Sequence, residues 1–123
     1  MNEVLLYIGG STALIWGVAH LFPTRNVVRD FGDISQDNRR IIAMEWINEG
    51  ATLIFLGVLT IIITLTHASA PASVLVYWFV AGMLVVLAVI SLFTGFRVRF
   101  LPFRLCPFIF TASALLIVLG VLG

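Results

Sequence analysis

Two carboxylates and an amide stand at the start of a long aliphatic segment, RRIIAMEWINEGATLIFLGVL. Glu45, Asn48 and Glu49 are three and four residues apart, so they share one face of a helix. Thr52 extends this face by another turn. Acids four residues apart repel each other, so at least one is expected to take a partner or a proton. Such a face can hold the polar end of a ligand or exchange protons with it.

A histidine on the preceding apolar segment is the expected partner. His20 lies just before Pro23, where that segment ends. In neighbouring antiparallel helices, His20 and Glu49 would lie at similar depth. The sequence therefore predicts a polar pocket for the head of an amphipathic ligand, such as a quinone or a lipid. Its predicted ligand-binding residues are Glu49, Asn48, Glu45, His20, Trp16 and Trp46, and no catalytic residue is identified.

A structural role for the same acids stays open. Glu45 lies near a predicted helix start, where the helix dipole favours a negative charge. In this alternative, Glu49 pairs with His20 or with a loop arginine and ties the helices together. The sequence favours this structural role for both acids, although acids inside a membrane are costly and often functional, which keeps the pocket open.

The composition places these residues in a membrane. Of the 123 residues, 61% are hydrophobic and 11% are charged, whereas soluble domains carry about a quarter charged residues. A bilayer crossing takes roughly 20 helical residues, and backbone groups in lipid must bond internally. We predict an all-α integral membrane protein with a four-transmembrane-helix bundle in one domain, 1–123. The expected helices are 4–22, 41–66, 73–96 and 107–122, with loops 23–40 and 97–106.

The fourth run is short for a full crossing. Either its helix includes the residues from Phe103 to Cys106, or the bilayer thins around it. Small residues recur at helical spacing in two runs and predict close helix packing. They are Gly9, Ala13 and Gly17 in the first run and Ala81, Ala88 and Gly95 in the third.

All seven basic residues are arginines, and they fall in two segments only. These are Arg25, Arg29, Arg39 and Arg40 after the first run, and Arg97, Arg99 and Arg104 after the third. With four crossings both segments lie on one side, which the positive-inside rule assigns to the cytoplasm. Both termini are then outside. The arginines are expected to contact lipid head groups, and the second segment to cover the pocket; nucleic acid is not an expected partner.

Few residues remain for redox or metal chemistry. Cys106, the only cysteine, cannot form an internal disulfide and is expected to pack as a small apolar group. His67 ends the second run, where the helix dipole favours histidine. No cluster has the number and spacing of ligands typical of zinc, so no metal site is predicted. The cofactor is left unspecified.

The first half of the chain resembles the DoxX-like group of small four-helix bacterial membrane proteins. The resemblance lies in GVAHLFPTRNVVRDFG followed by EGATLIFLGVL, with Glu49, Gly50 and Gly57 at the motif positions. His20 stands where the group often has a basic residue. The resemblance implies a helical bundle, and some members are tied to quinone-linked sulfur oxidation or to redox-stress complexes.

Three function classes follow from these features. The preferred one is a non-catalytic or accessory subunit in a bacterial or archaeal plasma membrane, with a pocket for a lipophilic ligand near the cytoplasmic face. A homo-oligomer or a membrane protein partner is expected. The alternatives are an oligomeric proton-coupled transporter or channel, and a small membrane enzyme that uses Glu49 as acid or base.

Overall fold

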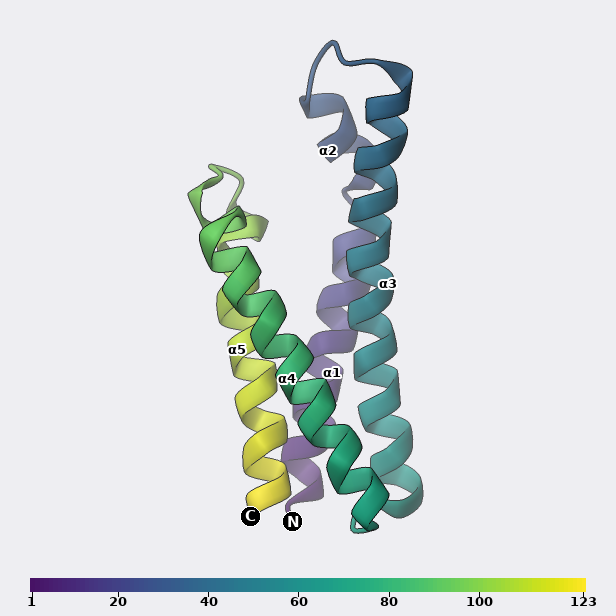
Figure 1. The fold of residues 1–123 in the computed structure, drawn as a ribbon, viewed down its shortest axis with the longest axis vertical. Helices are drawn as coiled ribbons and strands as arrows, with labels where there is room; N and C mark the ends of the chain where they lie inside the picture. The colour runs from purple at the N-terminus through teal and green to yellow at the C-terminus, as the bar shows by residue number, and fades with distance from the viewer.

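Four long helices form the fold, which confirms the predicted all-α class. The computed structural model describes residues 1–123 except for the side chain of His67, so the expectation for that side chain lies outside the described part. Four helices are long and apolar enough to cross a membrane, as in a multi-pass membrane protein (Figure 1). In chain order the elements are α1 (Glu3–Leu21), α2 (Thr24–Asp30), α3 (Gln36–His67), α4 (Pro71–Phe93), the 3-10 helix η1 (Gly95–Arg97) and α5 (Leu101–Leu122).

Two predicted loops are shorter in the structure. The segment 23–40 contains α2 and the start of α3, which begins at Gln36 because the Ser35 hydroxyl caps it. That hydroxyl accepts a hydrogen bond from the backbone N–H of Asn38 at 3.1 Å. Residues 101–106 belong to α5, so the predicted loop 97–106 is wrong over that part. Pro102 fits in the first turn of α5 because the N–H groups of a first helical turn have no acceptor within the helix. With its 22 residues, α5 is long enough to cross a bilayer.

The helices do not pack in chain order around a centre. α1 lies between α3 and α5, and α4 packs on α5. α3 and α4 meet near the turn that joins them and separate toward their other ends (Figure 1). Near that turn, a buried hydrogen bond of 2.9 Å joins the hydroxyls of Thr64 and Tyr77. Both termini lie at the same end as this turn, while α2 and η1 lie at the opposite end (Figure 1).

Two glycine pairs bring α1 and α3 into backbone contact. A Cβ on Gly57 would lie 2.6 Å from the carbonyl oxygen of Gly10, and one on Gly17 would lie 2.8 Å from that of Gly50. The glycines of each helix are seven residues apart, so the two pairs fix one antiparallel register. In that register, the end of α1 that carries His20 lies against the first turns of the apolar part of α3.

The small residues of α1 pack against two neighbouring helices and not against one. Gly17 faces α3, whereas a Cβ on Gly9 would meet Ile117 and the carbonyl of Ser113 on α5. The Ser113 hydroxyl donates to the Gly9 carbonyl at 2.7 Å, which ties α5 to α1. The predicted close packing is confirmed, but the three residues Gly9, Ala13 and Gly17 do not form a single contact face.

We expect Gly57→Ala to destabilise the bundle, because the added methyl group would lie 2.6 Å from backbone atoms of α1. Overpacking of this kind costs about 1–3 kcal/mol. The free energy of unfolding in detergent, measured with a denaturant titration, checks the value.

Gly82→Ala is the matched control, since a Cβ on Gly82 meets nothing within 4 Å. This variant should be as stable as the parent, or more stable by about 1 kcal/mol through the higher helix propensity of alanine. Equal stability of the two variants would contradict the glycine contact between α1 and α3.

Candidate functional site

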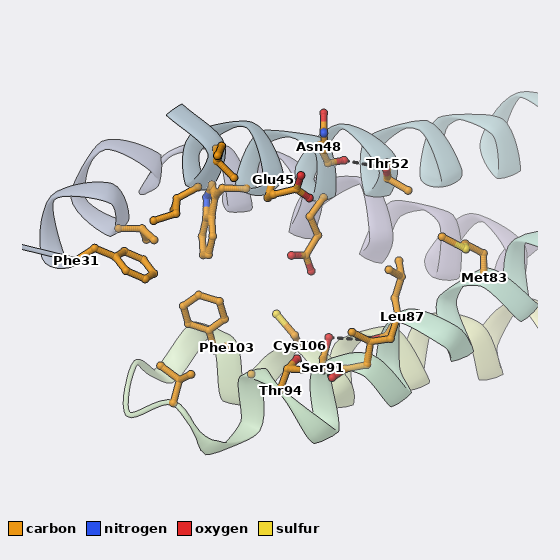
Figure 2. Close-up of a pocket in the computed structure, with 18 residues that line it drawn as sticks. Phe31, Glu45, Asn48, Thr52, Met83, Leu87, Ser91, Thr94, Phe103 and Cys106 are labelled. Carbon is orange, nitrogen blue, oxygen red and sulfur yellow. Dashed lines mark hydrogen bonds between the residues drawn. The ribbon is translucent and has the colours of Figure 1, made fainter. Parts of the chain in front are cut away.

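A cleft opens where α3 and α4 separate. Its volume is about 610 Å³, and most of its lining side chains are apolar. Glu45, Asn48 and Thr52 line it from α3, while Ser91 of α4 and Thr94 just after the end of α4 line the opposite side (Figure 2). The wall also includes the exposed side chains Ile41, Met83 and Ile90, so the cleft opens sideways between the helices.

Aromatic and aliphatic side chains occupy the two ends of the cleft. Phe31 and Phe103 lie toward one end and Met83 and Leu87 toward the other (Figure 2). No arginine is among the described residues that line the cleft. The second arginine segment nevertheless contributes Val98, Phe103 and Cys106 to the wall, while its arginines are exposed and do not line the cleft. The expectation that this segment covers the pocket stays a prediction.

At the inner wall of the cleft, a carboxylate and a thiol line the space, Glu49 and Cys106, and the side chain of His20 lies next to them without lining the cleft itself. Nε2 of His20 lies 3.4 Å from Oε2 of Glu49, as the antiparallel arrangement of the two helices predicts. A ring nitrogen of His20, a carboxylate oxygen of Glu49 and Sγ of Cys106 all lie within 4.8 Å of one another. The His20 side chain is only 4% exposed, and that of Glu49 is 32% exposed. Three different helices thus contribute one polar group each.

Trp46 fixes the position of the histidine ring. The two rings stack with their centroids 4.0 Å apart and their planes 15° apart. The indole N–H of Trp46 also donates to the backbone carbonyl of His20 at 2.5 Å. On its other side Trp46 meets the ring of Phe103 edge-on, with centroids 5.0 Å apart. Although Trp46 lines the cleft, its contacts support His20.

The other predicted residues take separate places. Glu45 and Asn48 are exposed on the α3 wall of the cleft, where the Asn48 carbonyl accepts a hydrogen bond from Thr52 (Figure 2). Trp16 does not line the cleft but packs against the core that includes Cys106. Among the described residues, the buried indole N–H of Trp16 and Nε2 of His20 have no hydrogen-bond partner.

Cys106 is the residue that sequence reasoning missed. It is buried as expected, with 3% exposure, but its side chain points into the cleft beside His20 and Glu49 (Figure 2). The thiol donates to the Pro102 carbonyl at 3.4 Å. Neither its position in the chain nor its neighbours indicates this contact. The prediction of no metal site considered only the spacing of possible ligands along the sequence. The fold brings together His20, Glu49 and Cys106, three side chains of types that can bind a metal ion.

The four arginines of the first segment surround a separate groove of about 500 Å³ between α2 and α3. These are Arg25, Arg29, Arg39 and Arg40. Arg39 donates to the carbonyl of Gly32 at 3.0 Å and thereby closes the turn between the two helices. Arg104 lies over the ring of Phe96, with its guanidinium carbon 5.5 Å from the ring centre.

Comparison of the chain with protein-family models, with curated proteins and with solved structures finds no match. The DoxX-like resemblance of the first half therefore stays a prediction.

Proposed function

We propose that the protein is a non-catalytic or accessory membrane subunit that holds the polar end of a lipophilic molecule in the cleft between α3 and α4. The ligand is quinone-like or a lipid. One observation carries this proposal: a sideways-opening apolar cleft has the partly exposed carboxylate of Glu49 on its inner wall, next to the buried ring of His20. Ligand sites of this type combine apolar walls with a few convergent polar groups.

The cleft offers different surroundings to the two ends of such a ligand. A head group at the inner wall would find the Glu49 carboxylate, with the hydroxyl oxygens of Ser91 and Thr94 opposite; both hydroxyls donate to helix carbonyls but their oxygens can still accept a hydrogen bond. An aliphatic tail would leave between Met83 and Ile90, past side chains that already face outward. A ligand could therefore enter from the lipid without leaving the membrane.

A proton-coupled transporter finds less support. Such a protein needs polar groups along its whole thickness, and the hydroxyls beyond the cleft bond to the helices themselves. Thr60 donates to the carbonyl of Leu56 at 2.8 Å, and Ser113 donates to that of Gly9 at 2.7 Å. An enzyme that uses Glu49 as acid or base would share the ligand site proposed here, so binding is the property to test first.

The proposed location is a bacterial or archaeal plasma membrane, with the α2 and η1 end in the cytoplasm and both termini outside. Support comes from the seven arginines, which all lie at or near that end. The groove of Arg25, Arg29, Arg39 and Arg40 suits anionic lipid head groups. Exposed apolar faces would be covered by lipid, by a second copy of the chain or by a membrane partner, and we propose a homo-oligomer.

Glu49→Gln should weaken retention of the bound lipophile by about tenfold to a hundredfold, because a hydrogen bond to a charged group contributes about 1.5–3 kcal/mol. Native mass spectrometry of protein released from mild detergent, together with an absorption spectrum, measures the bound mass and the oligomeric state.

Glu3→Gln is the matched control, since Glu3 is an exposed acid at the opposite end of the bundle. It should keep the ligand. Leu87→Trp, which fills the cleft without touching the His20–Glu49 pair, should lose it. A parent protein that carries only bulk lipid, or a Leu87→Trp variant that retains the ligand, would overturn the proposal.

A topology test uses single cysteines introduced by Asp33→Cys and Ser69→Cys in a Cys106→Ala background. These positions lie in the turns at the two opposite ends of α3. A membrane-impermeant thiol reagent added to intact cells should label position 69 and should label position 33 only after permeabilisation. The reverse pattern would invert the proposed orientation.

A further inference from the structure

The geometry points to a site for a divalent transition metal ion of the zinc type, formed by His20, Glu49 and Cys106 at the inner wall of the cleft. We propose that these three side chains are its protein ligands. The site goes beyond the lipophile pocket, since its three ligands need no lipophilic molecule to assemble.

The first argument is the distance between His20 and Glu49. Their separation of 3.4 Å between Nε2 and Oε2 is longer than a usual N–H···O hydrogen bond, and Nε2 is buried without a hydrogen-bond partner among the described residues. Two nitrogen and oxygen ligands about 2.0–2.2 Å from a tetrahedral metal lie about 3.4 Å apart. The pair thus already has the spacing of ligands to one ion, whereas a direct hydrogen bond would require the two groups to move closer.

The second argument is the arrangement of the third ligand. Sγ of Cys106 lies within 4.8 Å of both other donor atoms, so a small side-chain rotation brings it to the expected thiolate-to-metal distance of about 2.3 Å. The thiol now donates to a carbonyl of its own helix, at 3.4 Å from Pro102, and a thiol is only a weak donor. A metal ion would displace the thiol proton, which leaves to water in the open cleft, and the weak contact would be exchanged for a metal–thiolate bond.

The third argument is charge. A divalent cation with one thiolate, one carboxylate and one neutral imidazole makes a neutral group, which suits a site within the membrane-spanning part of the bundle. Thiolate and imidazole also favour zinc-type ions over magnesium or calcium. Because Glu49 and Cys106 both line the cleft, a fourth coordination position would face the cleft and remain open to a ligand atom or water.

The supporting contacts are those expected around a metal-binding histidine. Stacking on Trp46 holds the ring of His20 in one plane, and the backbone of His20 is held by the indole N–H of the same residue. Ligand side chains held by surrounding groups bind metals more tightly than mobile ones. A simple His20–Glu49 ion pair would account for two of these groups but would leave the position of Cys106 unexplained.

The test uses the full chain in detergent, kept reduced without added thiols, stripped of metal and then titrated with Co²⁺. We expect one ion per chain and a thiolate-to-cobalt charge-transfer absorption. Cys106 is the only cysteine, so alkylation of the protein thiol reports on this site alone. Bound Zn²⁺ should slow that alkylation by at least about tenfold, since a metal-bound thiolate is no longer free to react.

Variants separate the three ligands from the rest of the cleft. Cys106→Ser should abolish the charge-transfer absorption, and His20→Gln and Glu49→Gln should each weaken Co²⁺ binding by about tenfold or more. Glu45→Gln, an acid of the same cleft outside the cluster, should bind Co²⁺ like the parent.

Three results would overturn the site. They are a parent protein without the absorption, alkylation that Zn²⁺ does not slow, and a Glu45→Gln variant that loses as much Co²⁺ affinity as Glu49→Gln. Leu87→Trp separates the two proposals, because it should lose the lipophile but keep the metal. A parent that binds Co²⁺ yet carries no lipophile would leave the metal site standing and overturn the lipophile pocket alone.

Discussion

The approach of α1 to α3 at two glycine pairs is the constraint on which the rest of the structure depends. Where Gly10 meets Gly57 and Gly17 meets Gly50, the two backbones touch, and a Cβ on Gly57 or Gly17 would lie less than 3.0 Å from backbone atoms of the other helix. Packing, rather than exclusion of water, drives helix association inside a membrane, so close backbone approach is its main source of stability. Two pairs seven residues apart also allow only one register. That register places His20 opposite the turn of α3 that carries Trp46 and Glu49.

The cleft follows from where the remaining contacts lie. α4 packs on α5, and α5 on α1, so α4 meets α3 closely only near their connecting turn. The hydroxyl pair Thr64 and Tyr77 holds the two helices together there. Toward the other end α3 and α4 diverge. The polar side chains of α3 there line the cleft and do not pack against α4. The polar turn of α3 therefore lines the cleft. Without the cleft, its side chains would have to face lipid.

The cleft combines properties that favour binding over transport. Its polar side chains lie on α3 and on the facing segment between otherwise apolar lining residues, and the buried hydroxyls beyond it are satisfied by helix carbonyls. The lipophile pocket and the metal site share Glu49, but they occupy different parts of the cleft. The first uses the volume between α3 and α4. The second uses the inner wall together with His20 next to it, whose ring stacks on Trp46.

The amino-acid order alone predicts the four membrane helices, because long, mostly apolar runs in lipid must satisfy their backbone hydrogen bonds internally, as a helix does. It also predicts that His20 and Glu49 meet, since both lie near the connected ends of consecutive helices. It leaves open whether the last helix includes Phe103 to Cys106, and the structure starts α5 at Leu101, since arginine and proline at residues 102–104 look like a loop but fit a first helical turn. Only the tertiary structure places Cys106 with this pair. The reason is physical: Cys106 comes from the last helix, and its distance from α1 and α3 depends on how α5 packs on α1, which local spacing does not encode.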